Sequence, residues 1–587
     1  MVRWAGPLLI AVAGAAMLHW SWLKWPDPLV DFGRELYIPW QLTEGKTLYK
    51  DIAYFNGPLS PYVNSVWFRL FGVSVRTLVV CNLVVAAGLV CLLYRILSAI
   101  SNRLSATVAC LIFVLVPAFG QLGQVGNYNF LCPYSHEMTH GLVISVLAIF
   151  FLSMVQRRRG RLAAAGAGFA LGMVFLTKAE VFAAAALAMA VGIGLTLWAQ
   201  RPDARRSVGF LALFAGSAVL PVVLAFAFLR SAMPADQAWR GIVGSWPAAF
   251  NPDIASLKFY RVCMGLRDPG ASLKEILGWT GWYALVFLPA AGLALALRKP
   301  GLYRVGIAAA VFAVLALLLG RYEISWPKAV RPLPLVMLAS GLAAFVAFFR
   351  HRLDPQASRR AVLQITVVVL ATTLLAKMVL NVRLSHYGFV LAMPATLVLV
   401  VVLLDWVPVL LDRLGGCGGV FRAAGLAVLA VGVCGNLKII KTRFDPKIHP
   451  IAQGADTFLT DRPAVAKALY VIGRQLRPDQ TLVVLPEGVM LNYLARRANP
   501  TPYVNFMPPE LIIFGEDRIL ESFRTHPPDY IALAHKNTAE YGYRFFGRHY
   551  GQRLFAWVLN NYHRVHLVGY PPLVNKRFGI ELLKRNR

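Results

Sequence analysis

Three residues of the segment 123–140 have the types and the spacing of a catalytic zinc site. His136 and His140 lie four positions apart with Glu137 between them, in the order His-Glu-Met-Thr-His. On a helix this spacing places both imidazoles on one face, and the glutamate can act as the base of a metalloprotease. No third ligand is evident, and the motif stands at the entrance of an apolar run. Two other interpretations therefore stay open: the polar residues line the mouth of a cavity, or they bind a substrate.

A second polar group follows the first apolar run of the chain. Asp31, Arg34 and Glu35 lie within one helical turn. At the depth of the lipid headgroups a lower dielectric raises the pKa of an acid and strengthens its ion pairs. The alternative is that Asp31 is a solvated helix cap balanced by Arg34. Nearby aromatic residues are typical of a helix lying along the membrane surface: Tyr37, Trp40, Tyr49, Tyr54 and Tyr62.

The sequence FLTKAE, residues 175–180, places Lys178 and Glu180 between two apolar runs that are almost continuous. Ionisable groups at this depth are costly unless they are paired, so they are candidates for a functional site. A lysine there can bind a lipid phosphate as a point charge. The alternative is that Lys178 and Glu180 pair only to hold the helical hairpin together.

Two later polar loops carry further basic and aromatic residues, at 321–332 and 381–388. We expect five basic side chains to converge on one rim and to form a cradle for a phosphate or pyrophosphate headgroup. They are Lys178, Arg321, Lys328, Arg331 and Arg383. His386 and Tyr387 of the second loop are candidate substrate-binding residues. Aromatic belts and snorkelling basic side chains are the alternative explanation for both loops.

The elements that must position these residues are membrane helices. The 587-residue chain is 58% hydrophobic and only 15% charged, with a mean hydropathy of +0.58, whereas a soluble protein has roughly a quarter charged residues. Many apolar runs approach the roughly 20 residues that cross a bilayer as a helix. We predict thirteen spans, near 4–23, 76–98, 104–120, 140–155, 161–177, 180–199, 207–229, 277–297, 304–320, 332–350, 361–381, 388–411 and 419–437.

The basic residues predict the orientation of these spans. The net charge of +31 arises largely from clusters between apolar runs, at 156–161, 201–206, 298–304 and 350–360. By the positive-inside rule these clusters are cytoplasmic, which places the N-terminus inside and the polar loops outside. We expect an uncleaved first span rather than a signal peptide. No recognition motif accompanies the charge, so nucleic-acid binding is not expected.

The remaining part of the chain, residues 438–587, reads as a soluble outer domain. A helix is predicted near 462–477 and strands at 481–486, 529–534 and 563–570, which suggests a small α/β unit that follows a membrane module over 1–437. It has no glycine-rich phosphate loop or dinucleotide-binding motif. We expect the outer loops 24–75, 120–139 and 321–331 to surround one cavity, with this domain above it.

The seven cysteines contain no CxxC pair, and a disulfide between Cys132 and Cys263 is conceivable.

Two short motifs carry a resemblance to a known family. They are YFNGPLSPY, residues 54–62, and GFALGMVFLTKAE, residues 168–180, and they follow an aspartate placed just after the first span. Together they resemble the GT-C class of polytopic glycosyltransferases, in particular the protein O-mannosyltransferase-like enzymes and the lipid A aminoarabinose transferases. The resemblance is detailed over about the first 200 residues. It implies a GT-C-like helical membrane protein with an outer C-terminal domain.

The resemblance also implies roles for particular residues. Asp31 takes the position of the family's base on the acceptor, with Glu35 as the second candidate. Arg34 matches the arginine that follows it and is a candidate for binding the donor phosphate. The aminoarabinose transferases have an acid and a lysine where this chain has Asn56 and Gly57. Binding of the donor phosphate therefore passes to Lys178 or to the arginines of the later loops. Candidate substrate-binding residues are Tyr54, Asn56, His136, Glu137, His140, Glu180, His386 and Tyr387.

The implied activity is transfer of a hexosyl or pentosyl group from a polyprenyl-phosphate donor. The acceptor would be a glycan, lipid or protein on the outer face of a bacterial inner membrane. Inverting transfer needs a carboxylate to take the acceptor's proton and cations to stabilise the leaving phosphate. It requires no cofactor, although a divalent metal is compatible with it. Two other functions stay open: a transporter or flippase of a lipid-linked substrate, and an integral-membrane metalloprotease.

Overall fold

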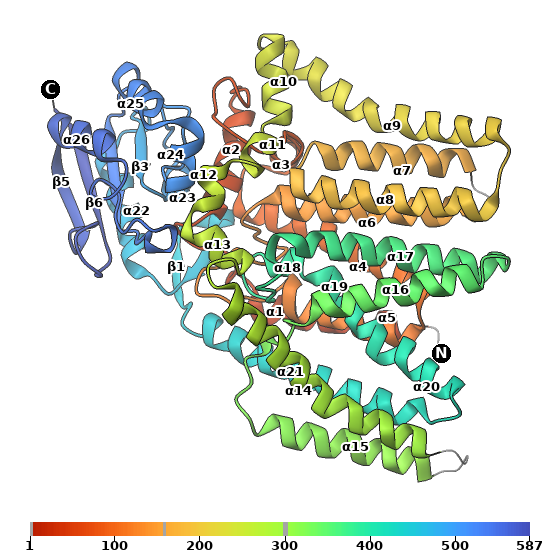
Figure 1. Cartoon of the computed structure of the whole chain (residues 1–587). Coiled ribbons are helices and arrows are strands. Elements are labelled where there is room, and N and C mark those ends of the chain that lie inside the picture. The colour runs from red at the N-terminus through yellow and green to blue at the C-terminus, as the bar shows by residue number, and fades with distance from the viewer. Residues whose placement is uncertain (1–3, 157–159, 298–302, 587) are drawn as a thin grey trace.

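A bundle of long apolar helices and a small mixed α/β domain make up the molecule. The computed structural model describes residues 4–156, 160–297 and 303–586. The α/β domain packs on one end of the bundle, and the N-terminus lies towards the opposite end (Figure 1). The last bundle helix, α21, continues to Phe444. The domain therefore begins several residues after the predicted boundary at 438.

Eleven segments of the described chain are long and apolar enough to cross a membrane. Two shorter apolar helices accompany them, so that the thirteen predicted runs all correspond to helices. The eleven are α1 (Ala5–Ser21), α4 (Val75–Ile100), α6 (His136–Val155), α8 (Ala179–Gln200), α9 (Ala204–Arg230), α13 with α14 (Lys258–Met264 and Pro269–Ala296), α15 (Tyr303–Gly320), α16 (Leu333–Arg350), α17 (Pro355–Leu375), α18 to α20 (Gly388–Leu391, Met393–Val401 and Val407–Arg413) and α21 (Gly418–Phe444). The shorter two are α5 (Arg103–Phe113) and α7 (Gly160–Phe175).

The outermost helices carry the chain's most exposed apolar surface. The most apolar 18 residues of α9 are only 6% buried, and the same is true of α15. Both stretches have a mean hydropathy above 2. Both helices lie at the periphery of the bundle (Figure 1). A soluble monomer rarely exposes so large a contiguous apolar surface. The arrangement agrees with a protein whose outer helices face lipid hydrocarbon.

The basic connections and the α/β domain lie at opposite ends of the bundle. The α8–α9 connection holds the cluster 201–206 and the α16–α17 connection holds 350–360. Both connections lie at the end away from the domain (Figure 1). Part of the cluster 156–161 and most of 298–304 lie outside the described residues.

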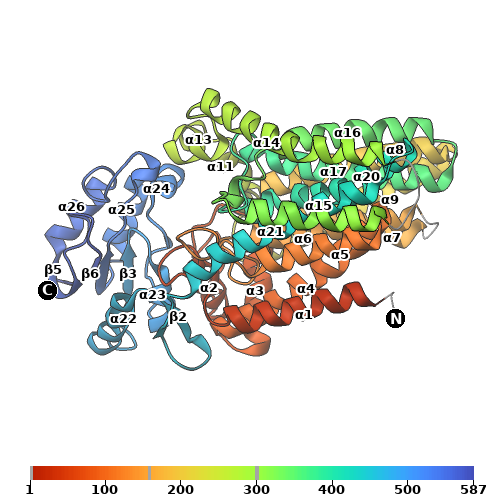
Figure 2. The same cartoon turned by 90° about the horizontal axis from the view of Figure 1, so that it is seen from below.

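Two short helices join the first span to the second and form the junction with the domain. They are α2 (Phe32–Thr43) and α3 (Leu59–Phe71). Tyr37 is almost fully buried and Trp40 is buried, because α2 packs against α23 (Val489–Ala495) of the domain and lies between the two parts of the molecule (Figure 2). A Cβ at Gly33 would stand only 2.4 Å from the backbone nitrogen of Met490. These aromatic side chains therefore face protein rather than lipid, and a position of α2 along the membrane surface stays a prediction.

The domain is built on a four-stranded sheet in the order β3-β4-β6-β5. Strands β3 (Leu482–Leu485) and β4 (Tyr530–Ala534) are parallel, and β6 (Gly579–Arg585) pairs antiparallel with β4 and with β5 (Tyr562–Gly569). Alternate side chains of β3 and β4 enter two cores, as the period of a strand requires. One of these two hydrophobic cores continues into the hydrophobic core of the helical bundle. The strands at β3, β4 and β5 confirm the prediction, whereas β6 was not predicted.

Helices and a short hairpin complete the domain. The predicted helix near 462–477 is α22 (Pro463–Gln475). The others are the strands β1 (His449–Ile451) and β2 (Phe458–Thr460) and the helices α24 (Pro508–Phe514), α25 (Glu516–Thr525) and α26 (Gln552–Asn561). Between α9 and α13 the chain forms three short helices. They are α10 (Ala235–Val243), α11 (Ser245–Ala249) and α12 (Pro252–Ser256).

Candidate active site

A cavity of about 760 Å³ lies where the bundle meets the α/β domain. Its lining comes from the loop before α2, the segment 122–134, the starts of α8 and α13, the end of α17 and the loop 383–387. The domain contributes residues from the segments 487–513 and 536–541. Eight of the predicted site residues line it: Asp31, Arg34, Asn56, Lys178, Glu180, Arg383, His386 and Tyr387.

Asp31 reaches this cavity through an unusual backbone conformation. Its φ of +56° with a ψ of −65° is rare for a residue other than glycine and costs of order 1–3 kcal/mol. Asp31 stands at the N-cap position of α2, but its side chain makes no capping hydrogen bond. The interpretation of Asp31 as a simple helix cap was therefore wrong. Strained residues of this kind occur where a side chain must be aimed at a functional site.

Hydrogen bonds from two side chains, Asp27 in the same loop and Asn127 in the segment 122–134, hold the backbone just before Asp31. Asp27 Oδ1 accepts hydrogen bonds from the backbone N–H groups of Leu29 and Val30, both at 3.0 Å. The side chain of Asn127 binds the same turn twice. Its Oδ1 accepts from the N–H of Asp27 at 3.0 Å, and its Nδ2 donates to the carbonyl of Val30 at 2.6 Å. Two loops distant in sequence thus set the position of Asp31.

The surroundings of Asp31 favour its protonated form more than water would. Burial, and next the negative charge of Glu487, raise the pKa of Asp31 to about 7, although Arg34 acts in the opposite direction. Arg34 is held in place by Glu35, at 3.3 Å, and by the carbonyl of Tyr134, at 2.9 Å. A carboxyl group with a pKa near neutrality is suited to accepting a proton from a substrate.

A cationic group stands across the cavity from Asp31. Lys377 Nζ lies 2.6 Å from Glu180 Oε1, and Lys178 Nζ lies 3.7 Å from the same oxygen. Arg383 has no carboxylate within ion-pair distance in the described part of the chain, and its Nη2 contacts Cys263 Sγ at 3.7 Å. Two lysines thus share one carboxylate, and Arg383 adds a further positive charge. The group carries a net positive charge that can neutralise an anion such as a phosphate.

The two motifs that carry the family resemblance pack on each other and place Lys178. The N–H of Gly57 donates to the carbonyl of Thr177 at 2.8 Å, and the N–H of Leu59 donates to that of Leu176 at 3.0 Å. A Cβ at Gly57 would stand 2.2 Å from the Leu176 carbonyl oxygen. Glycine is required at this close approach.

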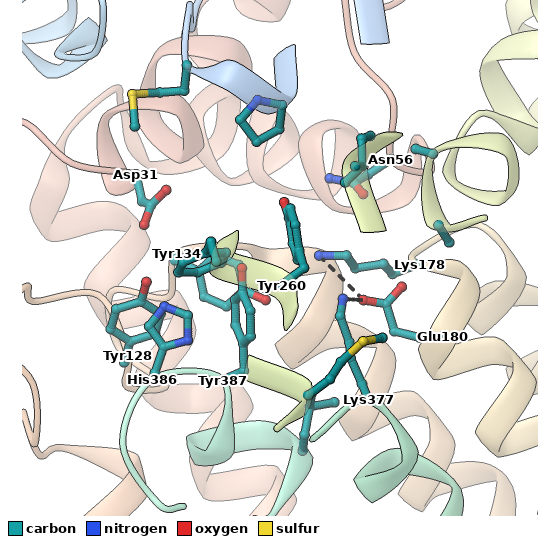
Figure 3. A pocket seen from close by; sticks show the side chains of 18 of the residues that line it. Asp31, Asn56, Tyr128, Tyr134, Lys178, Glu180, Tyr260, Lys377, His386 and Tyr387 are labelled. Atoms are coloured by element: carbon teal, nitrogen blue, oxygen red, sulfur yellow. Dashed lines mark hydrogen bonds and ion pairs between the residues drawn. The ribbon is translucent and has the colours of Figure 1, made fainter. Parts of the chain in front are cut away.

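Aromatic rings line the space between Asp31 and the lysines. Tyr134, Tyr260 and Tyr387 lie between the two groups (Figure 3). The rings of Tyr134 and Tyr387 are 5.1 Å apart. The ammonium groups of the two lysines lie over rings of this set, each at 5.5 Å: Lys178 over Tyr134 and Lys377 over Tyr387.

His386 is also part of this wall and is electrically neutral near pH 7. Its ring lies 4.4 Å from that of Tyr128. Burial, together with the charges of Arg383 and Lys377, lowers the pKa of His386 to about 3. The histidine therefore adds no positive charge to the cationic group.

The remaining predicted residues near Asp31 form a buried network behind the cavity. Glu35 Oε2 lies 2.7 Å from His136 Nδ1, and Asn82 Nδ2 lies 2.9 Å from His136 Nε2. Glu137 is hydrogen-bonded to Ser135, at 2.6 Å, and to the hydroxyl of Tyr54. Glu35, Tyr54, His136, Glu137 and His140 are all buried and do not line the cavity. None of the five is a lining residue of this cavity, so Glu35 as the second candidate base and the other four as substrate-binding residues remain predictions.

The His-Glu-Met-Thr-His motif does not fit a zinc site. Both ring nitrogens of His136 already have protein partners, and His140 Nδ1 lies 3.1 Å from Ser60 Oγ. Within residues 4–156, 160–297 and 303–586 there is no group of three or more His, Cys, Asp or Glu side chains placed to hold a metal ion. The metalloprotease interpretation lacks the ligand set that it needs.

Three of the basic residues expected in the cradle lie elsewhere. Arg331 Nη2 is 2.6 Å and Lys328 Nζ 3.5 Å from carboxylate oxygens of Glu275 on α14. Arg321 is exposed, and none of the segment 321–331 lines the cavity. Arg331 and Lys328 therefore pair with α14 instead of facing the cavity. Cys132 and Cys263 are both free thiols.

Several lining residues were not predicted from the sequence. Lys377 lies within the predicted apolar run 361–381, where the rule that a charge at membrane depth marks a functional site would have found it. Glu487, Glu510 and Lys536 come from the α/β domain, and no local pattern in their segments distinguishes them. Only the tertiary structure brings them to Asp31.

Comparison with known proteins gives one family match. The model of the dolichyl-phosphate-mannose-protein mannosyltransferase family matches residues 56–224. This segment contains both motifs, YFNGPLSPY from its third residue onward, and the match confirms the resemblance there. No curated protein matched the sequence.

Solved structures of two proteins are similar to this chain over nearly its whole length. ArnT from Cupriavidus metallidurans, bound to undecaprenyl phosphate, is 14% identical, with a TM-score of 0.47 over 98% of this chain and 97% of that one. The Archaeoglobus fulgidus oligosaccharyltransferase tethered to an acceptor peptide is also 14% identical, with a TM-score of 0.48. That match covers 100% of this chain and 74% of the other.

Proposed function

We propose that this protein is a glycosyltransferase that moves a sugar from a polyprenyl-phosphate donor to an acceptor on the outer face of the membrane. The observation that carries the proposal is the division of the cavity into two parts. A carboxyl group, Asp31, stands on one side, and the lysines Lys178 and Lys377 stand on the other (Figure 3). The family match over residues 56–224 supports the same activity.

The two sides suit the two halves of such a reaction. An acceptor hydroxyl attacks the anomeric carbon of the donor while Asp31 takes its proton. The bond between that carbon and the phosphate oxygen breaks, and the bonding electrons leave with the phosphate. Lys178, Lys377 and Arg383 stabilise the charge that develops on this leaving group. Attack from the side opposite the phosphate inverts the configuration at the anomeric carbon.

The apolar lining of the cavity suits the lipid part of the donor. Ala183, Ala248, Phe250, Ile254 and Leu374 line it. An apolar surface of this kind can bury the first isoprene units of a carrier while the phosphate contacts the cationic group. A donor with its tail in lipid and its headgroup at the membrane surface therefore matches the distribution of polarity.

The orientation of the chain follows from the same proposal. The basic clusters at 201–206 and 350–360 lie at the end away from the cavity, and the positive-inside rule places that end in the cytoplasm. The cavity and the α/β domain would then face the periplasm of a bacterial inner membrane. The transferred sugar is a hexose or a pentose, and the lysines and arginine neutralise the phosphate without a required metal ion.

Transfer can be tested with the full chain reconstituted in lipid nanodiscs. Polyprenyl-phosphate donors carrying radiolabelled hexoses or pentoses are supplied, and release of the label from the lipid is followed. We expect one donor class to be consumed and free polyprenyl phosphate to inhibit competitively. Movement of an intact labelled lipid between leaflets of proteoliposomes, without cleavage, would instead identify a flippase.

A further inference from the structure

The α/β domain contributes a carboxyl group to the cavity that the reaction above does not use. Glu510, on α24, lines the cavity, and only 8% of its surface is exposed. Asn505 Nδ2 donates a hydrogen bond to Glu510 Oε1 at 2.8 Å. The other oxygen, Oε2, receives no hydrogen bond from any residue in the described part of the chain. One oxygen of the carboxyl group is thus held while the other remains free.

Glu510 differs from two other glutamates of the cavity, Glu180 and Glu487, because each of those has an ion-pair partner. Glu180 pairs with Lys377 at 2.6 Å, and Glu487 pairs with Lys536 at 2.7 Å. Among the described residues, no lysine, arginine or histidine nitrogen lies within 4 Å of the carboxylate of Glu510. A buried carboxyl group without such a partner is costly, and that cost is typical of a functional site.

The surroundings of Glu510 place it with Asp31 rather than with the lysines. Burial raises the pKa of Glu510 to about 7, and the charges that act most strongly on it are those of Arg34 and Glu487. Glu510 in turn contributes to the raised pKa of Asp31. Asp31 and Glu510 line the same cavity, so an acceptor whose proton passes to Asp31 occupies the cavity that Glu510 lines.

We propose that Glu510 positions the acceptor by accepting a hydrogen bond from a second hydroxyl group, next to the one that attacks. The acceptor is then a saccharide, because adjacent hydroxyls are the rule in sugars. This inference rests on the proposed function and adds the class of acceptor to it.

The test uses the full chain in nanodiscs with the donor that the transfer assay identifies. Octyl β-D-glucopyranoside, its monodeoxy analogues and a serine-containing hexapeptide serve as acceptor probes. We expect transfer to the glucoside and weaker use of at least one deoxy analogue. In Glu510→Gln an amide oxygen replaces the carboxylate, so the KM for the glucoside should rise by about tenfold, the effect of exchanging a charged acceptor for a neutral one. The KM for the donor and kcat should stay near their normal values.

Two further variants separate positioning from folding. Glu510→Asp keeps the charge and should recover part of the affinity for the glucoside. Glu521→Gln changes an exposed acid on α25 that pairs with Arg524 at 3.5 Å and does not line the cavity, so it should leave every constant unchanged. Both proteins are compared with the parent by thermal unfolding, so that a loss of fold is recognised.

Several outcomes would overturn the inference. They are an unchanged KM for the glucoside in Glu510→Gln, equal use of all deoxy analogues, transfer to the peptide alone, or hydrolysis of the donor without transfer to any probe. In each of these cases the donor is still consumed, and the proposed function stands. A wild-type protein that consumes no donor would contradict the proposed function itself.

Discussion

The backbone N–H of Gly57 donates to the carbonyl of Thr177 at 2.8 Å, one residue before Lys178. This contact joins the two motifs that resemble the mannosyltransferase family. It explains why the first motif needs glycine, since a Cβ at this position would collide with the Leu176 carbonyl at 2.2 Å. The turn that carries Lys178 is thus set by a residue more than a hundred positions away.

Replacing Gly57 with Ala should therefore weaken donor binding. The backbone must move to relieve the collision, and Lys178 moves with it. We expect the KM for the donor to rise by about tenfold or more, since even small misplacements of binding groups are costly. Steady-state kinetics measure this, with Gly88→Ala as the control: Gly88 lies within helix α4, and a Cβ there would have no atom within 4 Å. An unchanged KM for the donor would show that this contact does not position Lys178.

The shared carboxylate predicts a coupling between the two lysines. Lys178→Met and Lys377→Met should each raise the KM for the donor before they affect turnover at saturating donor. Because Glu180 contacts both, the double variant should differ from the sum of the two single effects by about 0.5–3 kcal/mol. A double-mutant cycle on donor binding measures this term. Strict additivity would indicate that the lysines do not act on one phosphate.

The raised pKa of Asp31 predicts how the rate depends on pH. The active form is the carboxylate, so kcat/KM should rise as the pH increases through about 7 and should fall at lower pH. Removing the neighbouring charge in Glu487→Gln removes one cause of the raised pKa. The midpoint should then shift to lower pH. A profile that is flat between pH 5 and 8, or an upward shift in the variant, would contradict this assignment.

The partners of His136 predict a structural rather than a metal-binding role. Its two ring nitrogens lie 2.7 Å from Glu35 and 2.9 Å from Asn82. His136→Ala should lower the free energy of unfolding by about 3 kcal/mol, because it removes one of the two basic partners of the buried Glu35 carboxylate and leaves only Arg34. EDTA should leave transfer by the wild-type protein unchanged. Stoichiometric zinc, with inactivation by the chelator, would contradict both expectations.

The membrane helices were predictable because their apolar runs are close to, or above, the length that crosses a bilayer, whatever the tertiary structure. Asp31 and Lys178 were predictable as well, since a charge beside an apolar run needs an explanation. The strand β6 was not, because Gly579–Arg585 ends in charged residues and lacks a clear alternation. Its pairing with β4 and β5 makes it a strand.

The composition of the cavity was harder to predict than its existence. Arg331 and Arg383 look alike in sequence, as arginines at the ends of apolar runs. In the structure Arg331 pairs with Glu275 at 2.6 Å, whereas Arg383 faces the cavity without a carboxylate partner among the described residues. The difference depends on where α14 places Glu275. Likewise, Glu510 reaches the cavity only because the α/β domain docks on α2.

The most direct test of the central claim is the turnover of Asp31→Asn. Asparagine keeps the shape of the side chain but cannot take a proton at neutral pH. Single-turnover transfer at saturating donor should fall by roughly 10² to 10⁴, while polyprenyl phosphate, measured by competition, should bind as in the parent protein. Near-normal turnover in a variant that folds and binds the donor would contradict the assignment of Asp31 as the base.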